Sequence, residues 1–399
     1  MKTESEFIPS GGITLPEGFV AGATSAGIKY KNRPDLGVLY SEAPCAAAAV
    51  FTSNKVKAAP VILSQQHLQD GKAEAVVVNS GCANACTGKR GMKDAVEMVK
   101  LVAGKLGIVE DDVLVASTGV IGTMLPMEHI RAGIEEITLN TEGGHELARA
   151  IMTTDTVPKE VAVKAGGFTI GGMAKGSGMI HPNLATMLCF LTTDANIDAD
   201  YLRTALKEAV DISFNMLSID GDDSTNDMVL IMANGKSRGE PVVTGSEQAE
   251  VFREALNKVC IYLAKELARD GEGATRLIEV NVSGAVSPED ARTAARTIVG
   301  STLLKAAVHG SDPNWGRIIA AAGRSGAALE EDKLYLEIGG ICLVKDGAPV
   351  NYDKEKVVKH LGGDEVRIDL KLNMGDAAAT AWGCDLSEEY VTINSEYTT

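Results

Sequence analysis

Short apolar runs alternate along the chain with longer segments in which apolar residues recur every three or four positions. The continuous runs at 46–51, 75–78, 113–116 and 187–191 are typical of buried strands. The three-to-four period predicts helices at 88–106, 126–137, 144–152, 199–214, 246–269 and 288–299. Further strands are predicted at 228–232, 277–282, 334–344 and 366–372.

One segment, 161–173, predicts a β-hairpin, because its apolar residues alternate on both sides of Gly166-Gly167. Strands and helices therefore alternate along the chain, but without a strict βαβ rhythm. This pattern favours a layered α/β or α+β sandwich over a doubly wound parallel sheet. A length of 399 residues suits two domains or one large layered unit.

Composition excludes several classes of protein. Hydrophobic residues make up 45% and charged residues 23%, as in ordinary globular domains. The net charge of −16 argues against nucleic-acid or membrane partners. We expect no membrane span and no signal peptide, since no apolar run is long enough for a span and the first nine residues are charged. Seven scattered cysteines favour reduced thiols and a cytoplasmic location.

No metal and no nucleotide cofactor are expected. The aspartate-rich segment 220–227 looks like a calcium loop, but it lacks glycine at the sixth position and glutamate at the twelfth. Cys82 and Cys86 lie four residues apart, yet no second Cys or His pair follows at ligand spacing. Phosphate-binding loops of the GxGxxG or Gly-x4-Gly-Lys type are also absent from the sequence.

The stretch 174–187 is the most informative part of the chain. Gly176 and Gly178 permit backbone angles closed to other residues, and Pro182 fixes its own φ. The stretch therefore predicts a shaped loop that delivers Thr186 to the start of the buried strand 187–191. A hydroxyl at that place suits a nucleophile. The alternative is a β-branched residue that simply begins a strand.

This stretch also resembles a known family. The sequence Lys-Gly-Ser-Gly-Met-Ile-His-Pro-Asn-Leu-Ala-Thr-Met-Leu at 175–188 is similar to the cleavage and active-site segment of ornithine acetyltransferases, also called glutamate N-acetyltransferases. Other motifs of that family follow in order: Asn79-Ser80-Gly81, Ser117-Thr118-Gly119, Thr153-Thr154-Asp155-Thr156, Asp270-Gly271-Glu272-Gly273-Ala274-Thr275, Asp312-Pro313-Asn314-Trp315-Gly316-Arg317 and 394–399. One residue departs from the pattern: Cys82 stands where the family more often has asparagine.

The resemblance implies an α/β/β/α sandwich of the N-terminal-nucleophile-like type that cleaves itself between Ala185 and Thr186. The products would be an α chain, 1–185, and a β chain, 186–399, assembled as two α and two β chains. Cleavage would give Thr186 a free α-amine beside its hydroxyl. Because an α-amine has a pKa of about 7.7 to 8.0, it can act as the base that activates the hydroxyl near neutral pH.

The resemblance also implies roles for other residues. Thr118 and Gly119 would hold the oxyanion that forms on the attacked carbonyl, through a hydroxyl and a backbone N–H. Lys175 would lower the pKa of the new amine by its like charge and could bind a substrate carboxylate. Glu272 would bind a substrate amine. The remaining expected substrate contacts are Thr153, Thr399 and Asn394.

The function expected from this family is transfer of the acetyl group from N2-acetylornithine to glutamate through an acetyl-Thr186 intermediate. That cycle needs no organic cofactor, and the sequence leaves open whether acetyl-CoA also serves as a donor. Two alternatives remain at this point. The same nucleophile could serve an amidohydrolase or aminopeptidase if water resolved the acyl-enzyme, or the chain could be a non-catalytic amino-acid-binding protein.

Overall fold

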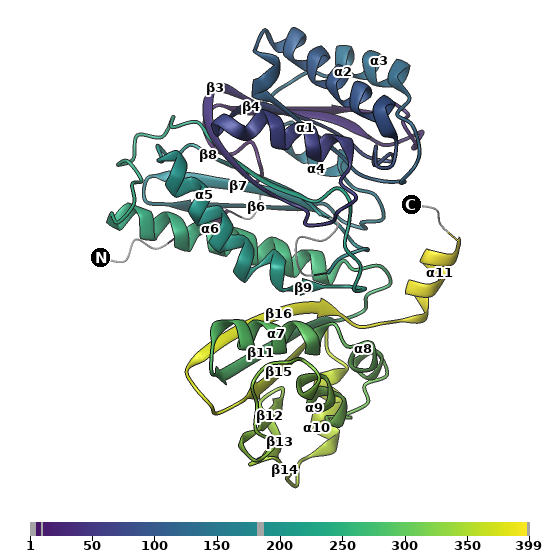
Figure 1. The fold of residues 1–399 in the computed structure, drawn as a ribbon, viewed down its shortest axis with the longest axis vertical. Helices are drawn as coiled ribbons and strands as arrows, with labels where there is room; N and C mark the ends of the chain where they lie inside the picture. Colours follow the sequence, from purple (N-terminus) through teal and green to yellow (C-terminus); the bar gives the residue numbers. More distant parts are fainter. Residues whose placement is uncertain (1–4, 9–10, 182–186, 397–399) are drawn as a thin grey trace.

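The strands of the protein form two sheets, one of nine strands and one of seven, among the residues that the computed structural model describes, 5–8, 11–181 and 187–396 (Figure 1). No helix within these ranges combines the length and the apolar character needed to cross a bilayer.

The larger sheet has the strand order β1-β6-β7-β8-β10-β3-β4-β5, and β2 pairs with β3 outside this path. Its strands are β1 (Glu6–Ile8), β2 (Phe19–Thr24), β3 (Leu36–Phe51), β4 (Lys72–Asn79), β5 (Val113–Ser117), β6 (Lys159–Ala165), β7 (Phe168–Lys175), β8 (Leu188–Thr193) and β10 (Met228–Ala233). The helices packed around it are α1 (Ala59–His67), α2 (Gly88–Leu106), α3 (Met127–Glu136), α4 (Gly144–Ala150), α5 (Ala199–Ile212) and α6 (Glu247–Arg269).

The long strand β3 divides the larger sheet into two halves. Its first part pairs with β2 and β4, and its last part pairs with β10. The register of β3 against β4 shifts between Tyr40 and Cys45, which marks a bulge where the strand can bend. One apolar cluster contains residues from both halves, such as Val76 of β4 and Phe190 of β8. The two halves therefore share one core.

Because successive side chains of a strand point to opposite faces of the sheet, the apolar residues that do not face the shared core face the helices. In β4, Val77 packs with helices α1, α2 and α3, while its neighbour Val76 faces the shared core. In β10, Val229 joins the cluster that holds α5 and α6. The layers thus run helix, sheet, sheet, helix, which confirms the predicted α/β/β/α sandwich (Figure 1).

The smaller sheet has the order β14-β13-β12-β15-β11-β16-β9 and lies beyond α6 in Figure 1. Apolar residues of its strands and of α7 belong to the same cluster as those of α5 and α6, so its core is continuous with the sandwich. The strands are β9 (Leu217–Ser218), β11 (Leu277–Ala285), β12 (Tyr335–Ile338), β13 (Ile341–Lys345), β14 (Ala348–Pro349), β15 (Glu365–Lys371) and β16 (Ala377–Cys384). The helices of this part are α7 (Pro288–Val299), α8 (Thr302–His309), α9 (Gly316–Gly323), α10 (Lys354–Leu361) and α11 (Glu388–Glu396).

Most predicted elements are present. The hairpin forms as β6 and β7 around Gly166 and Gly167, and helix α2 has the predicted bounds. The single strand predicted at 334–344 is wrong, because Gly339 and Gly340 have φ values of +59° and +76° and reverse the chain between β12 and β13. The short helices α1, α8, α9, α10 and α11 and the strand β16 were not predicted.

The larger sheet combines strands from both sides of the predicted cleavage site. β7 precedes this site and β8 follows it, and the two strands pair antiparallel. The predicted α and β chains would therefore not be separate folding units. The cleavage site itself, at Ala185 and Thr186, lies outside the described residues, so the division into 1–185 and 186–399 stays a prediction.

Candidate active site

A cleft of about 280 Å³ lies where several strand ends and loops of the larger sheet meet the loop after α6. Its lining includes six of the predicted site residues: Thr118, Gly119, Thr153, Lys175, Glu272 and Asn394. They come from the end of β5, the segment after α4, the end of β7, the loop after α6, and α11. The other predicted residues, Ala185, Thr186 and Thr399, lie outside the described part of the chain.

Strand pairing places the cleft residue Lys175 beside the start of β8. Lys175 of β7 pairs with Leu188 of β8, and Leu188 pairs with Met228 of β10. These three residues form one row across the sheet. In the sequence, Thr186 comes two residues before Leu188.

The predicted oxyanion residues sit at the end of β5, where the backbone is held tightly. The hydroxyl of Ser117 donates to the side-chain oxygen of Asn79 at 2.6 Å, and the amide of Asn226 donates to the carbonyl of Ser117 at 2.8 Å. These bonds are buried and fix the strand end from which Thr118 and Gly119 line the cleft. The arrangement offers a hydroxyl and a backbone N–H at one wall of the cleft.

Position 119 requires glycine because of its backbone angle and because of the atoms packed around it. Its φ is +127°, and a Cβ at this position would lie 2.4 Å from the carbonyl carbon of Gly81. Backbone atoms cannot move aside as a side chain can. Glycine therefore lets the strand end pass close to the 81–82 backbone, where Cys82 forms β-bridges with Thr118 and Val120.

We expect Gly119→Ala to destabilise the protein more than Gly122→Ala. Both glycines have positive φ, but nothing lies within 4 Å of a Cβ at Gly122. Each substitution loses about 1–2 kcal/mol through the backbone angle, and Gly119→Ala loses about 1–3 kcal/mol more through the clash. Urea unfolding of the two variants measures the difference. Equal losses would contradict this description of the strand end.

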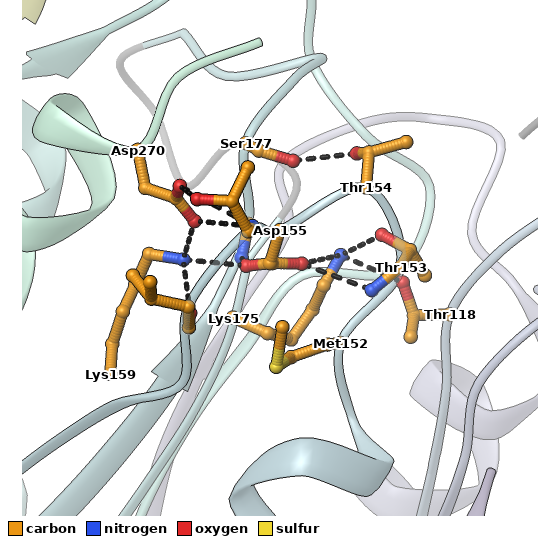
Figure 2. Close-up of polar contacts among 12 residues, drawn as sticks. Thr118, Met152, Thr153, Thr154, Asp155, Lys159, Lys175, Ser177 and Asp270 are labelled. Atoms are coloured by element: carbon orange, nitrogen blue, oxygen red, sulfur yellow. Dashed lines mark hydrogen bonds and ion pairs between the residues drawn. The ribbon is translucent and has the colours of Figure 1, made fainter. Parts of the chain in front are cut away.

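Lys175 is buried and makes its polar contacts inside the cleft wall. Its Nζ donates to Thr153 Oγ1 at 2.8 Å and to Thr118 Oγ1 at 3.3 Å (Figure 2). The Asp155 carboxylate lies 3.9 Å from the same nitrogen. Burial lowers the pKa of Lys175, and the charge of Asp155 opposes this effect. The lysine thus connects the predicted oxyanion residue Thr118 with the predicted substrate contact Thr153.

The cleft lining also includes a carboxylate, that of Glu272. The backbone N–H of Glu272 donates to the carbonyl of Ser177 at 2.7 Å, and Asn394 donates from its amide to Glu272 Oε2 at 2.8 Å. Gly178 makes room for this carboxylate, since a Cβ there would lie 2.5 Å from Oε2. Helix α11 stands at the side of the molecule in Figure 1, yet Asn394 brings it to the cleft.

The aspartate-rich segment 220–227 supports both sides of the predicted cleavage loop. Asp220 accepts the N–H of Ile180 at 2.9 Å, and Asp227 Oδ1 accepts the N–H of Met187 at 2.9 Å. Asp227 is fully buried, and this burial raises its pKa well above the ordinary value. Among the described residues, no group of three or more His, Cys, Asp or Glu side chains could hold a metal ion.

Sequence reasoning gave no role to Asp155, Asp227 or Asn226. Asp155 belongs to one of the family motifs, and the other two belong to the segment that looks like a calcium loop. Their burial beside the cleft marks them as candidates for a role in the site, since their relative exposures are 7%, 0% and 5%. Burial of a single polar residue leaves no periodic pattern in a sequence, so only the fold identifies these residues.

Comparison with known proteins agrees with this geometry. The model of a family described as the ArgJ family matches residues 20–399. The chain belongs to the ArgJ family. A relative from Dehalococcoides mccartyi, named arginine biosynthesis bifunctional protein ArgJ, is 53% identical over the whole of both chains. The protein of the same name from Bacillus subtilis is 48% identical over 98% of this chain and 97% of its own.

A solved structure adds a match at the level of the fold. The crystal structure of the arginine biosynthesis bifunctional protein ArgJ from Bacillus halodurans is 43% identical, with a TM-score of 0.50. It covers 52% of this chain and 97% of its own chain. Membership of the ArgJ family confirms the predicted resemblance, and with it the prediction of an acyltransferase of arginine biosynthesis over the two alternatives. The roles of single residues stay predictions.

Proposed function

We propose that this enzyme transfers the acetyl group of N2-acetylornithine to glutamate through an ester on Thr186. One observation carries the proposal. Thr118, Gly119, Thr153, Lys175, Glu272 and Asn394 line one cleft, although they are spread over most of the sequence. The cleft residue Lys175 pairs with Leu188, the first residue of β8, and in the sequence Leu188 is two residues after Thr186.

The proposed enzyme first cuts its own chain. The Thr186 hydroxyl attacks the carbonyl carbon of Ala185, the bond from that carbon to the Thr186 nitrogen breaks, and water hydrolyses the ester. The products are the α chain, 1–185, and the β chain, 186–399. One observation supports the cut: hydrogen bonds to Asp220 and Asp227 hold the chain on both sides of it.

In the first half of the catalytic cycle, the free α-amine of Thr186 takes the proton of its own hydroxyl. The oxygen then attacks the acetyl carbonyl of N-acetylornithine. Thr118 and Gly119 donate hydrogen bonds to the oxyanion that forms. When this intermediate collapses, the carbon–nitrogen bond breaks, and ornithine leaves with the proton from the α-ammonium group.

In the second half, the amine of glutamate attacks the acetyl-Thr186 ester. The same oxyanion contacts serve again, and N-acetylglutamate leaves as the threonine oxygen recovers its proton. Lys175 is suited to a substrate carboxylate and Glu272 to a substrate amine, because each presents the opposite charge. Thr153, Asn394 and Thr399 complete the proposed substrate contacts. The cycle uses no organic cofactor and no metal.

The experiment that tests this function measures ornithine release from N-acetylornithine with and without glutamate. We expect fast, continuous release with glutamate, and without it only an amount near one equivalent of enzyme. Continuous release at full rate without glutamate would instead identify an amidohydrolase, in which water resolves the acyl-enzyme.

Acetyl-CoA is a proposed second donor of the acetyl group to Thr186. The relatives are named bifunctional, which supports this extension. The measurement is release of free thiol from acetyl-CoA in the presence of glutamate, and loss of that release in Thr186→Ala would place both donors at one nucleophile.

We further propose a heterotetramer of two α and two β chains in the cytoplasm, without a nucleic-acid or membrane partner. Support comes from the family resemblance, from the net charge of −16 and from the seven cysteines, which are all free. Sedimentation of the native protein, compared with a denaturing gel, tests this assembly.

A further inference from the structure

Four charged side chains form a buried chain of alternating sign that leads away from the cleft. Lys175 Nζ lies 3.9 Å from Asp155 Oδ2, and Asp155 Oδ1 accepts from Lys159 Nζ at 2.8 Å. Lys159 Nζ also donates to Asp270 Oδ2 at 2.6 Å. The four side chains are at most 7% exposed. Figure 2 shows this order from Lys175 on the cleft side to Asp270.

Stability alone is a weak reason for such an arrangement. Removing a charge from water has a penalty of several kcal/mol, and packed apolar residues often replace a buried ion pair without loss. Here the network is well satisfied: Asp155 also accepts the backbone N–H of Gly176 at 2.6 Å and of Thr153 at 3.0 Å. A satisfied polar network of this kind fixes positions, because each member has only one geometry in which all its partners are met.

One end of this series of charged side chains contacts residues that line the cleft, and the other end lies close in sequence to a residue that does. At one end, Lys175 contacts the hydroxyls of Thr118 and Thr153. At the other end, Asp270 accepts the backbone N–H of Thr156 at 3.0 Å and lies two residues before Glu272. The four charged side chains therefore link the segment that carries Lys175, the cation of the cleft, to the segment that carries Glu272, its carboxylate.

We propose that Asp155, Lys159 and Asp270 are positioning residues that set both the place and the charge of Lys175 relative to Glu272. They thereby make the cleft selective for a ligand that carries a carboxylate and an amine, as amino acids do. The ligand part of this inference rests on the proposed function, whereas the electrostatic part concerns the folded protein alone.

The charges that face Lys175 have opposite effects on its pKa. Burial lowers this pKa most, and Lys159 lowers it further by like charge. The carboxylates of Asp155, Glu272 and Asp227 raise it. Asp155 itself keeps a pKa well below the ordinary value: burial would raise it, but Lys175 and Lys159 outweigh that effect. The sign of each side chain's effect on the pKa of Lys175 therefore alternates along the series of charged side chains.

This alternation predicts opposite results for neighbouring substitutions. Asp155→Asn removes a nearby negative charge and should lower the pKa of Lys175 by about one unit or more. Lys159→Gln removes a positive charge and should raise it. Asp270→Asn leaves Lys159 less neutralised, so it should lower the pKa again, by less than Asp155→Asn does. Lys164→Gln is the matched control, because Lys164 is an exposed lysine of the same strand as Lys159, and it should change nothing.

The measurement is nuclear magnetic resonance of lysine side chains in the full-length protein, titrated with pH. The Lys175 signal is the one that is missing from Lys175→Arg. In wild type it should titrate below an ordinary lysine. A wild-type titration at the ordinary value, or shifts of one common sign in the folded variants, would overturn the proposal. A wild-type titration at the ordinary value overturns the proposal even if no variant folds.

A second readout joins this network to the reaction. If Lys175 binds the carboxylate of glutamate as a cation, kcat/KM for glutamate falls as pH rises through the pKa of Lys175. The alkaline fall should move to lower pH in Asp155→Asn and to higher pH in Lys159→Gln. Opposite shifts in the titration with no change in this profile would support the electrostatic network and overturn its link to the ligand. Absence of acetyl transfer in wild type would refute the proposed function instead.

Discussion

Thr186→Ala should accumulate as one uncut chain and lose acetyl transfer almost completely. Both events use the same hydroxyl, first against the Ala185 carbonyl and then against the acetyl group. Removal of a catalytic nucleophile typically lowers kcat by about 10⁴- to 10⁶-fold. The checks are a denaturing gel for processing and ornithine release for transfer.

Thr186→Ser is the control for this prediction. Serine keeps a hydroxyl on the same carbon and, after cleavage, an α-amine beside it. This variant should therefore process and transfer measurably, although more slowly. Transfer by Thr186→Ala at a rate near that of Thr186→Ser would remove Thr186 from the mechanism.

Thr118→Val should lower kcat by about 10²- to 10³-fold, the usual effect of losing one donor of an oxyanion hole. Valine has the shape of threonine but no hydroxyl, and the oxyanion exists only in the transition state and intermediate. KM should therefore change much less than kcat. Steady-state kinetics with N-acetylornithine and saturating glutamate measure both constants.

The control here is Thr118→Ser, which keeps the donor and should stay close to wild type. Thr118 also accepts a hydrogen bond from Lys175 at 3.3 Å. A Thr118→Val effect caused by a displaced Lys175 would appear mainly in KM, because Lys175 is proposed to bind substrate. A large rise in KM with kcat unchanged would thus contradict the oxyanion role.

Much of the site could be predicted because its residues lie in short motifs that resemble those of a known family, and several of these motifs stand at element ends. Thr118-Gly119 follows an apolar run that ends at a polar residue, and this pattern is typical of a strand end. Glu272 lies between two glycines shortly after the long helix α6, whose N-cap residue Ser246 accepts the backbone N–H of Ala249. Local periodicity and turn chemistry predict these element ends, whereas the roles expected of Thr118, Gly119 and Glu272 come from the family resemblance.

The rest depends on long-range contacts that have no local signal. Lys159 and Asp155 look like an ordinary polar pair four residues apart, and their buried contacts are with distant residues, Asp270 and Gly176 respectively. The bend of β3 and the approach of α11 to Glu272 are likewise set by distant partners. In contrast, the turn at Gly339-Gly340 had a local signal, since paired glycines between apolar runs are typical of a hairpin.

The most direct test of the whole account is mass spectrometry of the purified protein, mixed with N-acetylornithine without glutamate and quenched in acid. We predict two chains that meet between residues 185 and 186, with one acetyl group on the peptide that begins at Thr186. Fully active protein that is intact across this bond, or an acetyl group on another side chain, would contradict the account.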